Sequence, residues 1–241
     1  MLSGWIRRSI TRCHQSHCLW CRLPMTTSNL VWCDDCLQFF SPTPRCQQCG
    51  VATVTPLEQC GACLSAPPSW DRLICIGEYQ RPLKPLVHQL KYQRQFWLAQ
   101  DLASLLAERI TTPAPLIVPV PLHWRRQLWR SFNQSELLAR HLTTALNVNM
   151  NASLFRRIRA TRNQHGLDRA ARKRNLRNAF SLTQAPLPLH IAIVDDVVTT
   201  GSTVGLLSKL LKKAGVQRVD VYCICRTGGN NEVNESVSPF Q

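Results

Sequence analysis

The amino-acid sequence predicts an α/β protein: a mostly parallel sheet with helices on both faces, preceded by a small Cys-rich module. Three observations lead to this expectation. Four CxxC pairs lie between residues 18 and 63. Strand-like and helix-like segments alternate from residue 72 onward, which is typical of parallel sheets. Two adjacent acids, Asp195 and Asp196, follow a buried-looking strand. Parallel sheets bind their ligands beyond the carboxyl ends of the strands, so the acids mark a candidate site.

Composition limits the class of protein and of partner. The chain has 241 residues and 44% hydrophobic content, enough for one core and a small second module. Lys and Arg number 29 against 14 Asp and Glu, a net charge of +15. Such an excess indicates a polyanionic partner (nucleic acid, a phosphorylated ligand or an anionic membrane surface), or else an ordinary basic surface.

No signal peptide and no apolar run of about 18 residues is visible, so no transmembrane segment is expected and the predicted location is cytoplasmic. Twelve cysteines in a reducing compartment need a role other than disulfide formation. Metal binding is the role that their spacing favours.

The CxxC pairs predict a double zinc ribbon over residues 1–66. Two CxxC knuckles supply four thiolates, which is a closed tetrahedral zinc site. The region has few aliphatic residues, so bound metal would supply its folding free energy. Sequential pairing of the knuckles is the simplest arrangement, and interleaved pairing remains open. The expected ligands of two structural Zn²⁺ ions are Cys18, Cys21, Cys33, Cys36, Cys46, Cys49, Cys60 and Cys63.

The second predicted domain covers residues 67–227 and begins after a Pro-containing hinge at Ser65 to Trp70. Short apolar runs predict its strands, apolar residues at helical spacing predict its helices, and Gly215 is placed to end the last helix. The tail, residues 228–241, has no periodicity and is expected to be disordered. The expected strands are 72–79, 116–121, 190–194 and 218–225, and the expected helices are 85–92, 96–110, 133–146 and 203–214.

The loop after Asp196 has the composition of an anion site. Its threonines and serine supply hydroxyls, and Gly201 lets the backbone approach a ligand. A helix begins there, so its free N–H groups and its dipole favour a phosphate. The two carboxylates can accept hydrogen bonds from a diol or hold Mg²⁺ through water. A phosphate beside a diol is a ribose 5-phosphate. The alternatives are a chance acidic strand end or a magnesium site of another α/β family.

The string "IAIVDDVVTTGST" resembles the signature of the type I phosphoribosyltransferases, which bind phosphoribosyl pyrophosphate (PRPP). The resemblance implies a type I phosphoribosyltransferase-like sheet in which the acids contact the ribose hydroxyls, the Thr/Gly loop wraps the 5-phosphate, and Mg²⁺ accompanies PRPP. The PRPP-binding residues that it implies are Asp195, Asp196, Val197, Thr199, Thr200, Gly201, Ser202 and Thr203.

A further match narrows the resemblance. Four CxxC pairs ahead of such a domain, with "VPVPLHWRRQLWRSFNQSELLA" and "TRNQHGLDRAARKRNLRNAF", resemble the ComF/GntX family from about Cys18 to Thr227. Members are associated with DNA uptake in competence or with use of external DNA. The resemblance therefore implies a PRPP-binding protein of DNA uptake or utilisation, with single-stranded DNA and the uptake machinery at the inner face of the membrane as expected partners. The sequence departs at Ser131 and in "KYQRQ" from Lys91, where the family commonly has Gly.

The segment Arg156 to Arg177 holds nine basic residues in 22, opposed only by Asp168. It is interpreted as a lid over the pyrophosphate of PRPP or as a surface for single-stranded DNA, helped by aromatics near residue 130. The remaining interpretation is a solvated face. "PVPLH", residues 119–123, is the candidate pyrophosphate loop. The residues predicted for pyrophosphate, lid or DNA contact are Pro121, His123, Arg162, Arg172, Lys173, Arg174 and Arg177.

No segment identifies the acceptor of a transfer reaction, so no catalytic residue is predicted. Three functions stay open. The first is a PRPP-binding accessory protein that engages DNA, which the resemblance favours. The second is an active phosphoribosyltransferase on a nucleobase or amine acceptor in nucleotide salvage. The third is a zinc-ribbon adaptor whose second domain binds nothing, which the intact acid pair opposes.

Overall fold

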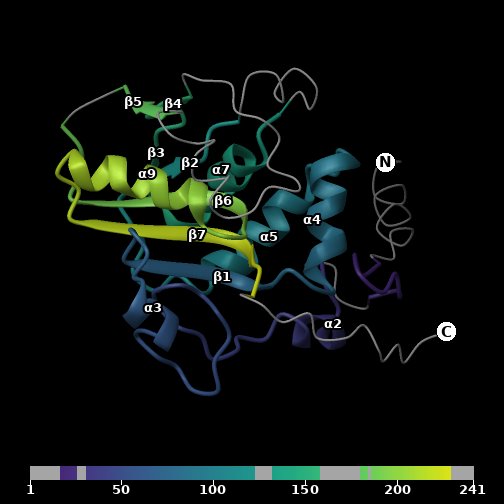
Figure 1. Ribbon diagram of the computed structural model, residues 1–241. Coiled ribbons are helices and arrows are strands. Elements are labelled where there is room, and N and C mark those ends of the chain that lie inside the picture. The colour runs from purple at the N-terminus through teal and green to yellow at the C-terminus, as the bar shows by residue number, and fades with distance from the viewer. Residues whose placement is uncertain (1–16, 26–30, 123–131, 158–179, 184–185, 229–241) are drawn as a thin grey trace, which may run out of the picture. The chain divides into compact units, whose positions relative to one another are not determined.

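The computed structural model describes residues 17–25, 31–122, 132–157, 180–183 and 186–228 (Figure 1). The chain divides into two compact units, Met1–Pro42 and Thr43–Gln241. The second of the four-cysteine sets, residues 46–63, belongs to the same unit as the sheet. The domain limits predicted from the sequence, at residues 66 and 227, stay predictions.

The first unit has a very small core. Its short helix α2 (Asp34–Gln38) begins directly after Cys33. In the part of this unit that the structure describes, the buried hydrophobic residues are Cys18, Met25, Trp32, Cys36 and Phe40. Trp32 packs edge-on against Phe40, with ring centroids 5.0 Å apart. A core of this size cannot offset the chain entropy lost on folding, so the unit needs a cross-link or a bound metal.

The second unit is built on a five-stranded sheet in the order β1-β7-β6-β2-β3. Every neighbouring pair in it is parallel, so the carboxyl ends of all five strands lie along one edge. This confirms the predicted parallel sheet. The strands are β1 (Arg72–Glu78), β2 (Leu116–Pro119), β3 (Asn149–Met150), β6 (His190–Val198) and β7 (Arg218–Arg226).

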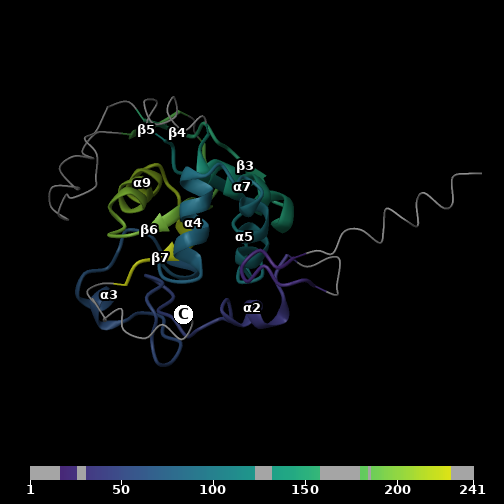
Figure 2. The same ribbon diagram turned by 90° about the vertical axis from the view of Figure 1, so that its right-hand side faces the viewer.

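Helices cover both faces of the sheet, as predicted (Figure 2). Helices α5 (Leu98–Ala107) and α7 (Gln134–Leu146) lie on one face, and α4 (Leu83–Tyr92) packs against α5. Helix α9 (Ser202–Lys213) covers the other face. Alternate residues of β6 and β7 pack with α9: its Val204, Leu207 and Leu211 form one buried cluster with β-strand residues such as Ile191 and Val221. The short helix α3 (Gly61–Ser65) carries Cys63.

Strand β6 is longer than the expected 190–194, and it carries both acids within the strand. The reason is that β7 continues to pair beside it, with Asp195 opposite Cys223 and Val198 opposite Arg226. Two further strands, β4 (Phe155–Arg157) and β5 (Phe180–Leu182), form an antiparallel pair. They were not predicted because three residues are too few to show a period. Their pairing places Arg157 opposite Phe180.

None of the helices in the described ranges is long and apolar enough to cross a membrane.

Candidate functional site

Hydrogen bonds fix both acids near the carboxyl end of β6. The Ser135 hydroxyl and the Asp196 N–H group each donate to Asp195 Oδ1 at 2.9 Å. The Val197 N–H group donates to Asp196 Oδ1 at 2.6 Å. The two carboxylates are thus held in place by the backbone and by the first turn of α7. Held carboxylates of this kind are ready to accept hydrogen bonds from a ligand without reorganising.

Asn133 explains why Ser135 is in position. It is the N-cap residue of α7, and its side-chain oxygen accepts from the Ser135 N–H group at 3.1 Å. Its Nδ2 donates to the Val120 carbonyl oxygen at 3.0 Å. The Val120 N–H group in turn donates to the Val194 carbonyl oxygen at 2.9 Å. One asparagine therefore ties the start of α7 to the residue just beyond β2, beside the acids. Pro121, from the predicted pyrophosphate loop, follows Val120 directly.

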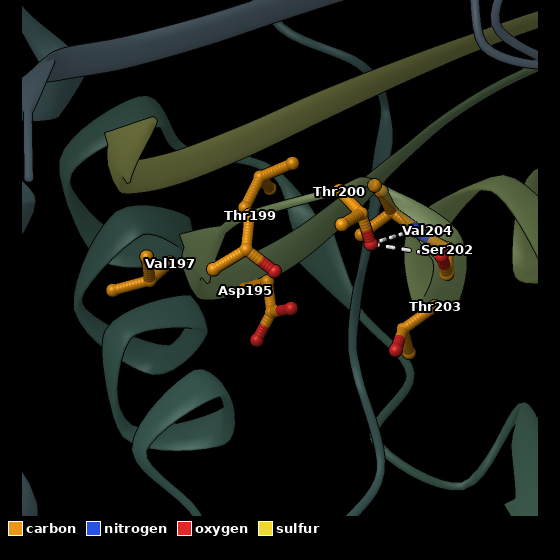
Figure 3. Close-up of a pocket in the computed structure, with 9 residues that line it drawn as sticks. Asp195, Val197, Thr199, Thr200, Ser202, Thr203 and Val204 are labelled. Carbon is orange, nitrogen blue, oxygen red and sulfur yellow. Dashed lines mark hydrogen bonds between the residues drawn. The ribbon is translucent and has the colours of Figure 1, made fainter. Parts of the chain in front are cut away.

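A pocket lies along the loop that joins β6 to α9 (Figure 3). Seven of the eight residues that the sequence predicted for PRPP line it; Asp196 does not. The Thr200 and Ser202 hydroxyls are 2.8 Å apart, and in the view of Figure 3 Asp195 lies below Thr199. The full lining is Asp195, Val197, Val198, Thr199, Thr200, Gly201, Ser202, Thr203 and Val204.

The end of this loop is shaped to receive an anion. Gly201 has φ +70°, a left-handed conformation that favours glycine, and it is the N-cap residue of α9. The Ser202 N–H group makes a long hydrogen bond of 3.4 Å to Thr200 Oγ1. Because Gly201 has no capping side chain, the N–H groups of Thr203 and Val204 stay available to a ligand. A Cβ atom at Gly201 would lie 2.4 Å from Trp70 Cη2, so the position excludes every larger residue.

The side chains of Trp70 and Arg226 support the loop and connect it to the second four-cysteine set. Trp70 lies against Gly201, and its indole N–H group donates to the Gln48 carbonyl oxygen at 2.7 Å. Arg226 donates to the Cys49 carbonyl oxygen at 3.0 Å, to the Val198 carbonyl oxygen at 3.2 Å and to the Thr199 carbonyl oxygen. The backbone of the cysteine set and the backbone of the anion loop therefore share two supports.

Burial dominates the electrostatics of the acid pair. It raises the pKa of Asp195 to about 7, with a further increase from the charge of Asp196; the Ser135 hydroxyl and the Lys91 ammonium act in the opposite direction. Asp196 has a different partner. Its Oδ2 lies 2.9 Å from Lys91 Nζ, at the end of α4. Sequence reasoning did not select Lys91, although it flagged the stretch that begins there.

The eight CxxC cysteines form two groups of four, paired sequentially. In each group the four sulfur atoms all lie within 4.8 Å of one another. The first group is Cys18, Cys21, Cys33 and Cys36, and the second is Cys46, Cys49, Cys60 and Cys63.

The sulfur geometry fits zinc. Four sulfurs bound at 2.3 Å to a tetrahedral ion are about 3.8 Å apart. The sulfur–sulfur distances are 3.7 Å for Cys21 and Cys33, 3.7 Å for Cys49 and Cys60, and 3.9 Å for Cys46 and Cys63. Burial raises the pKa of Cys36, Cys49 and Cys63, whereas backbone N–H groups outweigh burial at two positions and lower the pKa of Cys18 to about 6 and the pKa of Cys60 to about 7. Each group could therefore bind one structural Zn²⁺.

Named relatives decide the family. The chain is 43% identical over 223 residues to DNA utilization protein YhgH of Salmonella typhi, and the alignment covers 87% of this chain and 96% of that protein. It is 36% identical over 222 residues to Competence protein F of Haemophilus influenzae, with the same coverage. The chain belongs to the ComF family. This confirms the resemblance drawn from the sequence motifs. No family model matches the chain.

Among solved structures, the ComF-family chain resembles adenine phosphoribosyl transferase from Trypanosoma brucei, in a complex with AMP, pyrophosphate and ribose-5-phosphate. The TM-score is 0.36 and the identity 10%, over 62% of this chain and 75% of that chain.

Several predicted contact residues of the ComF-family chain lie outside the described residues. They belong to segments 123–131 and 158–179 and are His123, Arg162, Arg172, Lys173, Arg174 and Arg177. The aromatic residues Trp124 and Trp129 lie there too. Phe132 is described, and it packs edge-on against Phe96 with ring centroids 4.4 Å apart. This favours the packing role for Phe132 over base stacking.

Proposed function

We propose that this ComF-family protein binds PRPP at the carboxyl end of β6. One observation carries the proposal: two fixed carboxylates stand directly beside an anion loop at a helix N-terminus. A ribose 5-phosphate carries a phosphate and a diol, the two groups that such an arrangement would bind. The ribose hydroxyls would donate to Asp195 and Asp196, and the 5-phosphate would accept from the loop hydroxyls and the first N–H groups of α9.

Metal ions enter this proposal in two roles. Zn²⁺ in the two four-cysteine groups would be structural, because four thiolates leave no open position for a substrate. Mg²⁺ would arrive with PRPP; it suits hard oxygen ligands and would neutralise part of the pyrophosphate charge. The residues beside it, Asp195 and the loop hydroxyls, offer oxygen atoms of that kind.

Calorimetric titration tests the binding. We expect PRPP with Mg²⁺ to bind the protein in a saturable way and far more tightly than inorganic phosphate, because only PRPP also engages the acids. Equal heats for the two compounds, or none, would contradict a PRPP site. Release of pyrophosphate on addition of candidate nucleobases or amines would identify a transferase, the alternative function, whereas binding without release favours an accessory protein.

We propose further that the protein acts in uptake or utilisation of exogenous DNA. Support comes from the printed names of its relatives, DNA utilization protein YhgH and Competence protein F, and from its own net charge of +15. A cytoplasmic location, with contacts to uptake machinery at the inner face of the membrane, follows from this role and belongs to the same proposal. In this role the expected partner is single-stranded DNA, which the basic segment 156–177 would contact.

Salt dependence tests direct DNA contact. If segment 156–177 follows a phosphate backbone, single strands should bind with little sequence preference. Four to five engaged cations should give a log–log salt slope of about −3, at about −0.7 per phosphate. Replacing Arg172, Lys173, Arg174 and Arg177 with Ala should flatten the slope and weaken all sequences alike. The measurement is fluorescence anisotropy of a labelled oligonucleotide, and equal binding by the two proteins would assign the segment to a solvated face.

A further inference from the structure

Lys91 occupies a position at the acid pair that the proposed function does not use. It lies in the last turn of α4 and reaches across to β6, where Nζ is 2.9 Å from Asp196 Oδ2. The two side chains are mostly buried, with 19% and 13% of their surfaces exposed. Burial lowers the pKa of Lys91, but the charge and hydrogen bond of Asp196 raise it more, and the net pKa lies above its usual value. The ammonium group is therefore charged.

The hydrogen bonds of the acids show what this ion pair blocks. Asp196 uses Oδ1 for the Val197 N–H group and Oδ2 for Lys91. Among the described residues, the hydrogen bonds of Asp195 all go to Oδ1. Asp195 lines the pocket, and Asp196 does not. A ligand hydroxyl can therefore reach Asp195 directly, but it reaches Asp196 Oδ2 only when Lys91 moves or shares that oxygen.

A displaced Lys91 needs a new anion. Removing one partner of a largely buried ion pair is costly, because the other charge stays desolvated and unpaired. Neither Lys91 nor Asp196 lines the phosphate pocket, and Lys91 approaches Asp196 from α4, a helix that contributes no residue to the pocket lining. A ribose that spans from the loop to the acids directs its 1-substituent away from the loop. In PRPP that substituent is the pyrophosphate. Its negative charge would replace the Asp196 carboxylate as the partner of the Lys91 ammonium.

We propose that Lys91 is an exchanging cation: it neutralises Asp196 in the empty site and moves to the 1-pyrophosphate when PRPP binds. Lys91 would thereby distinguish PRPP from ribose 5-phosphate, which offers the same diol and 5-phosphate but no second anion. The proposal rests on the proposed PRPP site.

The test compares two ligands across matched variants of the full chain, both with Mg²⁺ present. Lys91→Met should weaken PRPP about tenfold or more, the value of a lost charge-assisted contact. It should leave ribose 5-phosphate affinity unchanged or higher, because that ligand no longer competes with the ammonium. Lys91→Arg, which keeps the charge, should retain most of the PRPP affinity. Lys84→Met, on an exposed residue of the same helix, is the control and should change neither affinity. If Lys91→Met does not fold, Lys91→Gln replaces it with the same expected results.

Two results would overturn the proposal while the PRPP site stands. One is an equal loss of both ligands in Lys91→Met, which means that Lys91 only positions Asp196. The other is no loss of either ligand. If the wild-type protein binds neither PRPP nor ribose 5-phosphate, the proposed function fails and this proposal fails with it.

Discussion

Replacing Asp195 with Asn should abolish detectable PRPP binding and at the same time stabilise the empty protein. Binding is lost because a neutral amide accepts the ribose hydroxyls weakly and no longer balances Mg²⁺. Stability rises because burial and the charge of Asp196 raise the pKa of Asp195 to about 7, so its ionised form is unfavourable in the fold. At pH 8 we expect a gain of about 1–3 kcal/mol in the free energy of unfolding, discounted for partial exposure.

The sign of the pH dependence follows from the same shift. An acid whose pKa is 3.8 when unfolded and about 7 when folded binds more protons in the folded state between these values. The free energy of unfolding of the wild type therefore falls, through Asp195, as the pH rises from about 4 to 7. The advantage of Asp195→Asn should be near zero at pH 4 and complete above pH 7. Thermal melts of the two proteins over that range measure it, and a constant difference would contradict the account.

Asp196→Asn is the matched variant, with the opposite expected effect on stability. It should also lose PRPP binding, but it leaves the Lys91 ammonium mostly buried without its carboxylate. We expect a loss of about 1–3 kcal/mol, below the 3–5 kcal/mol typical of fully buried pairs. Two adjacent acids would then share one effect on binding and show opposite effects on stability. The same stability change in both variants would contradict the assigned ion pair.

Cys49→Ser should lower both the melting temperature of the second unit (Thr43–Gln241, called the sheet unit below) and its affinity for phosphate ligands. The backbone beside Cys49 receives the Trp70 and Arg226 hydrogen bonds that also support the anion loop. The Gln47 carbonyl oxygen accepts from the Leu73 N–H group of β1 at 2.9 Å, so the edge of the sheet depends on this segment too. A loss of about 3 kcal/mol should lower the melting temperature by about 6–12 °C. We expect ribose 5-phosphate affinity to fall about tenfold, a change of about 1.4 kcal/mol.

Cys21→Ser is the control for this prediction. It removes the corresponding ligand from the other four-cysteine group, which lies in the first compact unit. Each variant should lose one equivalent of zinc, measured by elemental analysis, but only Cys49→Ser should weaken ligand binding and lower the melting temperature of the sheet unit. Equal effects of the two variants, or iron in place of zinc, would refute the assignment.

The sequence predicted the elements whose apolar pattern is long. Strands β1, β2, β6 and β7 and helices α4, α5, α7 and α9 were all expected, since seven to thirteen residues show a period and β2 is bounded by prolines. It missed β3, β4 and β5, which have two or three residues each and form through pairing alone. It ended β6 too early because acids discourage a strand assignment, whereas pairing with β7 sustains the strand to Val198.

The residues of the candidate site also fall into two classes, those that the sequence predicted and those that it missed. The anion loop is contiguous in sequence, so its composition revealed it. Three further residues reach the site from other elements: Lys91, Ser135 and Arg226. Contacts between distant segments leave no local pattern in the sequence, so these residues were missed. Trp70 was placed in a hinge on the strength of its neighbouring prolines, but it is 6% exposed and fixed by a hydrogen bond and by Gly201. The sequence signal that could have found it is the pair of glycines, Gly201 and Gly205, that it packs against.

Amide hydrogen exchange tests the central claim, a PRPP site between β6 and α9, most directly. The N–H groups of Thr203 and Val204, in the first turn of α9, should exchange readily in the empty protein, because Gly201 provides no side-chain cap. On saturation with PRPP and Mg²⁺ we expect strong slowing in a peptide that covers residues 195–205 and none in one that covers α5, Leu98–Ala107. Saturable PRPP binding with unchanged exchange in residues 195–205 would contradict the account.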